Sequence, residues 1–253
     1  MLDSDDPHLT SLLVADQQAK SPDHELAALH LPILNFDIRE PFLPLAVGYA
    51  TFRDRRPSAS FPRIIDPGPD EVAIEYAIWW DWDIGHLYEL EHIWVYLDET
   101  GQPSRGEASW HGEFHFMGRD GSLPLENGHL SLFSEPGKHA FAPDPRWFQV
   151  RKERTVWNCC QGAGNRGLLE SNAFRGAFPA KSASVDRLIQ SYLRNFTFTP
   201  SYRFELSFPL PPEMLVPRTR LREWIPERIE RTILRLERIK LPQPETLNCE
   251  RAA

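Results

Sequence analysis

Two short segments of the sequence gather side chains that could bind a metal ion. Residues 79–97 read WWDWDIGHLYELEHIWVYL, and residues 107–116 read EASWHGEFHF. In a β-strand alternate side chains share a face, so Glu89 and Glu91 would point one way and His92 the other. Carboxylates with one or two imidazoles are the ligand set of Mn, Fe or Zn sites, whereas a set made mostly of oxygens suits Mg or Ca. The residues raise the hypothesis of a divalent-metal site, and they leave the identity of the metal open.

A hairpin would bring the two segments together. If the chain turns within DETGQPS, residues 106–117 form one strand. One face of this strand then carries His111, Glu113 and His115. Glu91 would lie opposite His111, and Glu89 opposite Glu113. Facing carboxylates repel each other unless a positive charge neutralises them, which a divalent cation would do. A slip of one residue in this register would separate the two sets.

An ordinary solvent-exposed sheet face is the alternative, because such faces also alternate Glu and His with apolar residues. Alternation alone favours it. Five of the eight tryptophans, however, fall in the two strands and in the loop before them, namely Trp79, Trp80, Trp82, Trp94 and Trp110. Large aromatic side chains gathered in this way are more typical of a ligand pocket than of open surface. His129 and His139 are either lining residues or turn residues.

The hypothesis assigns roles to particular residues. The predicted metal ligands are His86, Glu89, Glu91 and His111. The predicted acid/base groups are Asp83, Glu113 and His115, with His92 as a further candidate. The predicted ligand-binding residues are Trp80, Trp82, Trp110 and His139. A metal ion could polarise a substrate oxygen while a nearby Glu or His moves the proton. Aromatic walls beside carboxylates suit a sugar or another polyhydroxylated substrate, so we predict a metal-dependent hydrolase or lyase.

Other catalytic motifs are missing from the sequence. It contains no serine nucleophile elbow and no metalloprotease helix motif. The glycine-rich segment CCQGAGNRGLLESNAF lacks the spacing and the lysine of a phosphate-binding loop, which argues against nucleotide binding. The sequence gives this segment no other role.

The elements that would position these residues are mainly strands. Strand patterns are found over 72–80, 89–97, 106–117, 128–134 and 202–208, and the apolar run 31–52 predicts one or two more. Short, proline-rich connections favour antiparallel pairing. Helical spacing follows over 182–196 and 219–239, where apolar residues form one stripe of each helix.

We therefore predict a mainly β (α+β) fold. It is an antiparallel β-sandwich with two or more amphipathic helices packed on it and a more helical C-terminal part. Residues 1–30 are expected to form an N-terminal arm. Residues 31–253 are expected to form a single β-sandwich domain with a C-terminal helical extension.

Composition excludes several classes of function. The chain has 253 residues, of which 41% are hydrophobic, enough for a sizeable core. Its net charge of −8 argues against a nucleic-acid partner, because phosphates attract clustered Lys and Arg. The acidic N-terminus does not resemble a secretory signal, and no apolar run is long enough for a transmembrane segment. We expect a soluble, cytoplasmic protein that binds a small molecule or a glycan, and a homodimer is compatible with the sequence.

The cysteines do not predict a disulfide framework. Cys159 and Cys160 are adjacent, and Cys249 lies in the C-terminal tail. They lack the Cys-x-x-Cys spacing that tunes a reactive thiolate. We expect reduced, buried side chains in a reducing compartment.

Three segments, GHLYELEHIWVY, SWHGEF and LFSEPGKHAF, resemble the necrosis-inducing-protein-like cytolysins and a related vacuolar-protein-sorting-like family. In the cytolysins a Gly-His-Arg-His-Asp-Trp-Glu motif leads into an apolar strand, and a Ser-Ala-His-Gly segment follows on the next. The metal ligands of that motif are a His, an acid three residues later and an acid two residues after that. His86, Glu89 and Glu91 repeat this spacing.

The resemblance implies a β-sandwich with a divalent-metal site. It also implies that Asp81 or Asp83 supplies an upstream aspartate and that His111 matches the His of Ser-Ala-His-Gly. The second histidine, the arginine and the tryptophan of the motif are absent here, so membrane lysis is not implied. The resemblance leaves a second class of function open, a non-catalytic module in which a divalent ion organises a glycan or lipid-headgroup site. The third class of function is a scaffold protein whose His and Glu residues simply lie on the surface.

Overall fold

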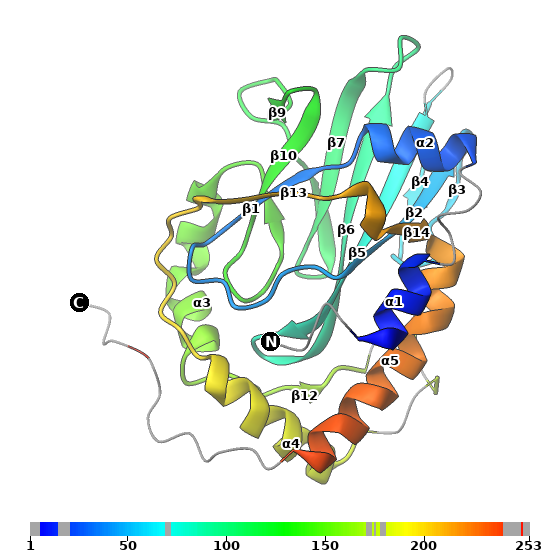
Figure 1. The fold of residues 1–253 in the computed structure, drawn as a ribbon. Helices are drawn as coiled ribbons and strands as arrows, with labels where there is room; N and C mark the ends of the chain where they lie inside the picture. The colour runs from blue at the N-terminus through cyan, green and yellow to red at the C-terminus, as the bar shows by residue number, and fades with distance from the viewer. Residues whose placement is uncertain are drawn as a thin grey trace.

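Two β-sheets and the helices packed on them make up the fold in the computed structural model (Figure 1). The structure describes residues 6–14, 21–68, 72–170, 174, 176–177, 181–239 and 249. Figure 1 shows β1, β10 and β13 crossing in front of β5, β6 and β7. Apolar side chains of both sheets join one core, including Leu34, Leu132, Ile78 and Ile93. The predicted mainly β, α+β sandwich with packed helices is confirmed.

The larger sheet carries the candidate site. Its strand order is β14-β2-β5-β6-β7-β8, and β12 pairs with β6. Its strands are β2 (Ala46–Phe52), β5 (Val72–Asp83), β6 (His86–Leu97), β7 (Pro103–Trp110), β8 (Glu113–Phe116), β12 (Gly167–Leu168) and β14 (Leu215–Pro217). β5 and β6 are long and almost wholly buried, because other elements cover both faces of the sheet. Their apolar runs therefore belong to the centre of the sheet.

The smaller sheet has the order β11-β10-β1-β13, with β9 paired to β10. Its strands are β1 (Ile33–Phe36), β9 (Leu125–Glu126), β10 (His129–Ser134), β11 (Phe141–Ala142) and β13 (Leu206–Pro209), and β3 (Arg56–Pro57) pairs with β4 (Ile64–Ile65) elsewhere. Both β10 and β11 contact β7. The segment between β10 and β11 is thereby held close to the larger sheet.

Helices pack at the ends and on the outer side of the larger sheet. They are α1 (Pro7–Val14), α2 (Pro22–Leu29), α3 (Lys152–Cys159), α4 (Ala183–Leu193) and α5 (Arg218–Arg238), with short 3-10 turns η1 (Pro145–Arg151), η3 (Arg194–Phe196) and η4 (Pro212–Met214). Ser182 caps α4, since its side chain accepts from the Val185 amide. The predicted stripe of α5 is buried from Leu221 to Leu236. α1 and α2 lie within the predicted arm, yet Leu9, Leu12 and Ala27 are buried in the core. The division into an arm and a domain stays a prediction.

Most strand pairs are antiparallel, as predicted, but the sheets are mixed. Three pairs are parallel: β1 with β10, β12 with β6, and β14 with β2. Each pair joins strands that are far apart in the sequence, such as Ile33 and Ser131, so the crossover is long. The prediction considered only strands that follow one another along the chain.

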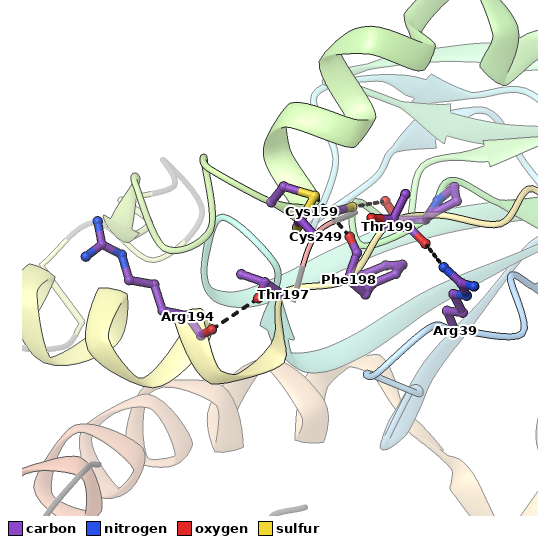
Figure 2. The surroundings of a disulfide bond; sticks show 9 residues. Arg39, Cys159, Arg194, Thr197, Phe198, Thr199 and Cys249 are labelled. Atoms are coloured by element: carbon purple, nitrogen blue, oxygen red, sulfur yellow. Dashed lines mark hydrogen bonds between the residues drawn. A yellow bond between two sulfur atoms is a disulfide. The ribbon is translucent and has the colours of Figure 1, made fainter. Parts of the chain in front are cut away.

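The expectation of reduced cysteines is wrong for two of the three. Cys160 forms a disulfide with Cys249, which is 89 residues away, whereas Cys159 is free and buried (Figure 2). Burial raises the pKa of the Cys159 thiol well above its usual range, so this thiol is not a reactive thiolate. Disulfides are rare in a reducing cytoplasm, and a cytoplasmic location stays a prediction. None of the helices in the described part of the chain combines the length and apolar character needed to cross a membrane.

Candidate metal centre

The turn between β5 and β6 brings three ligand-type side chains together. Asp83 pairs with His86 at the end of the hairpin, and Glu89 follows three residues later. An ideal strand would point His86 and Glu89 to opposite faces, because their spacing is odd. Tyr88 has a positive φ of 56° and breaks this alternation. One ligand atom from each of Asp83, His86 and Glu89 lies within 4.8 Å of the others, and we call these three residues the Asp83 cluster.

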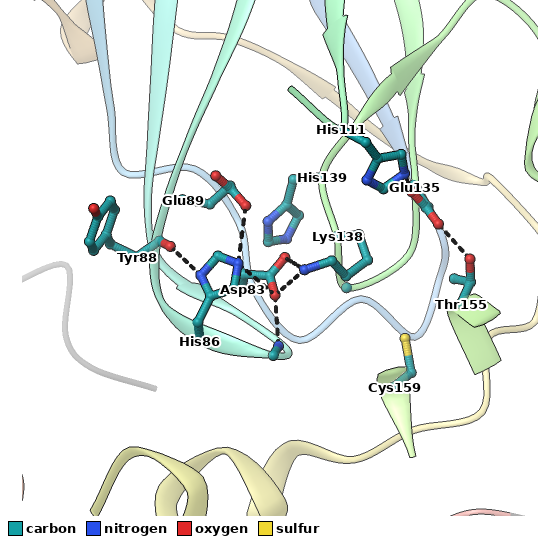
Figure 3. A network of polar contacts seen from close by, with 12 residues as sticks. Asp83, His86, Tyr88, Glu89, His111, Glu135, Lys138, His139, Thr155 and Cys159 are labelled. Atoms are coloured by element: carbon teal, nitrogen blue, oxygen red, sulfur yellow. Dashed lines mark hydrogen bonds and ion pairs between the residues drawn. The ribbon is translucent and has the colours of Figure 1, made fainter. Parts of the chain in front are cut away.

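The imidazole of His86 presents a lone pair to the other two residues (Figure 3). Its Nδ1 lies 2.8 Å from the Tyr88 carbonyl oxygen, which can only accept, so Nδ1 carries the proton. Nε2 is then unprotonated. It lies 3.4 Å from Asp83 Oδ1 and 3.5 Å from Glu89 Oε2, and it has no hydrogen-bond donor among the described residues. Burial lowers the pKa of His86 to about 3, so the ring stays neutral near pH 7.

Lys138 supplies the one ammonium group that contacts the cluster among the described residues. Its Nζ lies 2.5 Å from both carboxylate oxygens of Asp83, and the Gly85 amide donates to Asp83 Oδ1 over 2.7 Å. Asp83 is fully buried. Burial raises the pKa of Asp83, but in the acid range where Asp83 titrates His86 is protonated, and its charge together with that of Lys138 outweighs burial and lowers the pKa to about 2. Asp83 is therefore ionised in the folded protein.

Two further carboxyls make the region electron-rich. Burial, followed by the charge of Asp83, raises the pKa of Glu89. Burial, followed by the charge of Glu89, raises the pKa of Glu91 well above its usual range. Glu91 accepts a hydrogen bond from Ser109 Oγ. One ammonium group thus faces three carboxyls, and a second positive charge would let all three ionise.

Cation binding is expected to stabilise the protein more at about pH 7.5 than at about pH 5. Glu89 and Glu91 have raised pKa values in the folded state, so their contribution to stability is full while they are protonated. This contribution is lost as the pH rises through the raised pKa values, because the two carboxyls then ionise in a buried site. A bound cation neutralises the ionised carboxyls and so restores the lost stability. His86 is neutral at both pH values. Melting temperatures with and without Mn²⁺ at the two pH values check this, and an equal or larger gain at the lower pH would contradict it.

The segment 134–139, between β10 and β11, holds Lys138 in place, and we call it the SEPGKH loop. Glu40 Oε2 accepts from the Gly137 amide over 2.7 Å, and Glu40 Oε1 lies 3.4 Å from His139 Nε2. The His139 ring stacks on Trp80, with ring centroids 4.6 Å apart. The loop also carries Glu135, which accepts from Thr155 Oγ1 over 2.5 Å. The SEPGKH loop is thus fixed by partners on both of its sides.

The glycine-rich segment that the sequence left unexplained closes around the turn between β5 and β6. The Gly164 amide donates to the Ile84 carbonyl over 2.8 Å, and the Arg166 amide donates to the Gly85 carbonyl over 2.9 Å. Gly164 has a φ of 70°, and a Cβ there would lie 2.4 Å from the Gln190 backbone. Glycine in this segment therefore allows the backbone to pack closely beneath the Asp83 cluster.

The predicted register between the two ligand-bearing segments is wrong. Residues 106–117 do not form one strand, because the chain reverses at His111 and Gly112, whose φ values are 52° and 88°. β7 and β8 thus form their own hairpin, in which Trp110 pairs with Glu113. Glu113 and His115 consequently lie in β8, a short strand at the edge of the sheet whose residues are all exposed. The structure does not bring them to the Asp83 cluster.

The other predicted residues occupy separate surroundings. His111 Nε2 lies 2.6 Å from Glu135 Oε2, on the far side of Lys138 and His139 from His86 in Figure 3. His92 lies against Ser60, with 2.9 Å between Nε2 and Oγ. Asp81, the other aspartate considered for the site, is held by Arg228 and not by the cluster. His129 Nδ1 contacts the Leu31 carbonyl oxygen at the start of β10.

Among the predicted aromatic residues, Trp110 lines a groove. Trp80 and Trp82 are buried, and Trp82 packs on Tyr192. Trp110 lines an open groove of about 680 Å³. The groove is also lined by His115, Arg119, Asp144, Arg146 and Trp147. Asp144 accepts hydrogen bonds from Arg146, and Arg119 lies 3.3 Å from it. We call this depression the Trp110 groove.

Sequence reasoning missed three residues of the network. They are Glu40, Glu135 and Lys138. Glu135 and Lys138 stand in LFSEPGKHAF, a segment whose prediction rests on His139 and on the family resemblance alone. A cation and an acid beside a Pro-Gly turn were the available signal. Glu40 lies almost 100 residues from Gly137 in the sequence, and nothing in its own surroundings indicates the contact.

Two solved structures match part of this fold. One is NLPPya in complex with glucosamine, with 15% sequence identity and a TM-score of 0.36 over 50% of this chain and 71% of that chain. The other is Necrosis and Ethylene inducing Protein 2 from the causal agent of cocoa's Witches Broom disease, with 19% identity and a TM-score of 0.31 over 49% and 68%. No family model and no curated protein matches. The resemblance to the necrosis-inducing proteins is confirmed for about half of the chain and assigns it no function.

Proposed function

We propose that this protein binds a divalent cation through Asp83, His86 and Glu89, and that the cation organises a binding site for a glycan or another polyhydroxylated ligand. The observation that supports the cation is the buried Nε2 lone pair of His86. It faces two carboxylate oxygens at 3.4 and 3.5 Å and has no hydrogen-bond donor in the described part of the chain. A buried imidazole lone pair that converges with two carboxyl groups, of which only Asp83 is paired with an ammonium, fits a cation.

The distances within the cluster also suit a metal ion. Two donor atoms that each lie about 2.1 Å from a metal, at tetrahedral angles, are about 3.4 Å apart. The two separations from His86 Nε2 match this value. An imidazole nitrogen with carboxylates favours Mn, Fe or Zn over Mg or Ca. Glu91, whose pKa burial and the charges of Glu89 and Asp83 raise, would be a third carboxyl, able to hold a water on the ion. The bound ion would supply the positive charge that the carboxyls lack.

The Trp110 groove is the proposed ligand surface. Sugars bind to proteins through the face of an aromatic ring and through hydrogen bonds to planar polar groups, and the groove offers both in Trp110, Trp147 and the Arg146–Asp144 pair. His111 follows Trp110 directly and contacts Glu135 of the SEPGKH loop. Lys138 of the same loop contacts Asp83. The cation cluster and the groove therefore border one loop, so that a change in the Lys138–Asp83 contact on ion binding would be felt at the groove.

Binding is favoured over hydrolysis or elimination. The predicted acid/base groups Glu113 and His115 lie in exposed β8, away from the proposed ion. Asp83 is buried and engaged by Lys138 and the Gly85 amide, so it is not placed to move a proton to a ligand. These placements support the non-catalytic alternative.

Glycan binding is expected to depend on both the cation and Trp110. Against a panel of immobilised glycans, the Mn²⁺-loaded protein should bind at least tenfold more tightly than the chelated protein, a difference of about 1.4 kcal/mol. Trp110→Ala should lose glycan binding by a similar factor and keep the cation. Trp157→Ala is the matched control, because that exposed tryptophan lies on α3 and outside the groove. Equal affinity in chelator would reject the proposal, and cation-dependent release of product would replace binding by catalysis.

A further inference from the structure

Lys138 occupies the position where a divalent ion would neutralise Asp83. Its ammonium lies 2.5 Å from each carboxylate oxygen of Asp83, and the side chain is 9% exposed. Both oxygens that Asp83 could offer to a metal are thus engaged by a cation that belongs to the protein. The sequence motif that suggested metal ligands contains no such lysine, because Lys138 comes from a loop 55 residues further along the chain.

We propose that Lys138 is a tethered counter-cation that competes with the divalent ion for Asp83 and thereby sets the affinity of the site. This inference rests on the proposed cation site. With no ion bound, Lys138 neutralises Asp83. When an ion binds, the ammonium leaves Asp83. The buried site therefore has two states. In one the Lys138 ammonium neutralises Asp83, and in the other the divalent ion does.

Electrostatics prevents the two cations from sharing Asp83 at close range. A divalent ion and an ammonium about 4 Å apart repel by several kcal/mol even at the effective dielectric constant of a protein interior. Asp83 lies within a buried hairpin and cannot move to serve both. The ion must therefore displace the ammonium or bind with reduced affinity.

The backbone of the SEPGKH loop restricts this exchange to the lysine side chain. The Lys138 and His139 amides both donate to the Glu135 carbonyl, over 3.0 and 2.9 Å, and the Gly137 carbonyl accepts from Ile84 over 2.9 Å. The loop also contains two residues with positive φ, Gly137 and His139. Four rotatable side-chain bonds remain free for Lys138 to withdraw. The movement needs no refolding of the loop.

Competition with a built-in monovalent charge also selects the kind of ion. A monovalent ion that replaced the Lys138 ammonium would leave the charge of the cluster unchanged. A divalent ion adds one unit of positive charge and so neutralises a second carboxyl among Glu89 and Glu91. The lysine therefore lowers the affinity for both kinds of ion, and only a divalent ion gains a further interaction that offsets the loss of the lysine contact.

The Lys138→Met variant tests the competition, because methionine keeps an unbranched, flexible side chain that is one atom shorter and removes the charge. Mn²⁺ affinity is measured by calorimetry on the full chain, with Lys152→Met as the control that removes an exposed lysine. Lys138→Met is expected to bind Mn²⁺ at least tenfold more tightly than the wild type. It is also expected to melt at a lower temperature without the ion and to regain stability when the ion is added. Lys152→Met should match the wild type.

The outcomes separate this inference from the proposed function. If Lys138→Met binds Mn²⁺ and the wild type does not, the result supports Lys138 as the competing cation. It then rejects the proposal that the function of the wild-type protein depends on a bound cation. Equal or weaker binding by the variant overturns the inference and leaves the proposed function standing, whereas no binding by either protein rejects both. If Lys138→Met does not fold without the ion, Glu91→Gln is compared with Glu91→Gln/Lys138→Met, which has one buried carboxylate fewer. The double variant must again bind Mn²⁺ more tightly for the inference to stand.

Discussion

The Glu89→Gln variant is expected to lose Mn²⁺ affinity by about 100-fold, or about 2.7 kcal/mol, while its cation-free form becomes more stable. The loss follows because an amide oxygen carries no formal charge and is a weak ligand for a divalent ion. The gain has a separate cause. Burial and the charge of Asp83 raise the pKa of Glu89, which means that its ionised form is unfavourable in the folded protein. Glutamine removes this unfavourable charge.

Glutamine retains the local contacts of Glu89. Its amide oxygen can accept from the Leu90 amide, as Glu89 Oε1 does over 3.0 Å. The Glu89 side chain is 16% exposed, so the added NH2 group has access to water. A changed fold is therefore not expected to cause the loss of affinity. Opposite signs for affinity and stability distinguish a ligand from a residue that only supports the structure.

The measurement combines calorimetric titration with Mn²⁺ and thermal unfolding of the chelated protein near pH 7.5. Glu113→Gln is the matched control, since Glu113 is an exposed acid of β8 that the sequence also proposed for the site. It should change neither quantity. A Glu89→Gln protein that binds Mn²⁺ as the wild type does would remove Glu89 from the ligand set. Lower stability without the ion would contradict the electrostatic argument.

Local patterns were sufficient to predict the elements that carry the site. The apolar runs of β5 and β6 are bounded by turns, and both helices with a predicted stripe, α4 and α5, bury that stripe. The spacing of His86, Glu89 and Glu91 placed candidate ligands at the start of one strand. These features depend on residues close together in the sequence, where side-chain period and turn chemistry decide the structure.

The β7–β8 hairpin shows how one turn changes a site. Two residues with positive φ, His111 and Gly112, reverse the chain where a single strand was expected. A residue-Gly pair between apolar residues is a hairpin signal, and His111-Gly112 fits it as well as the predicted turn at Gly101 does. The additional reversal moves Glu113 and His115 to an exposed edge strand and leaves His111 in the turn, next to Glu135.

The partners that complete the site come from distant parts of the sequence. Lys138 is 55 residues from Asp83, Glu40 is 97 residues from Gly137, and Cys249 is 89 residues from Cys160. Charge, spacing and periodicity describe neighbours along the chain, whereas these contacts depend on how the two sheets meet. The parallel pairing of β1 with β10 brings the SEPGKH loop to the turn between β5 and β6, and nothing local encodes it.

The Arg228→Met variant is expected to destabilise the protein by about 3–5 kcal/mol. Arg228 of α5 is buried, and its guanidinium donates to both carboxylate oxygens of Asp81, over 3.0 and 2.7 Å, and to Asp6 over 2.5 Å. Removal of the guanidinium leaves Asp81 as a buried charge with the Trp79 indole as its remaining donor. Chemical denaturation measures the free energy of unfolding. Arg231→Met is the control, because its pair with Glu227 is exposed and should contribute less than about 1 kcal/mol.

Removing the charge of Asp81 should restore much of this loss, which makes the cause testable. Asp81→Asn/Arg228→Met keeps an acceptor for Trp79 and leaves no unpaired buried charge at that position, so it should be more stable than Arg228→Met. Mn²⁺ affinity should be unchanged in both variants, because Asp81 faces α5 whereas Asp83 faces Lys138. A large loss of affinity in the double variant would instead identify Asp81 as the upstream ligand that the family resemblance left open. Unequal stability with equal affinity would show that two aspartates separated by one residue serve different purposes, Asp81 the attachment of α5 and Asp83 the cation.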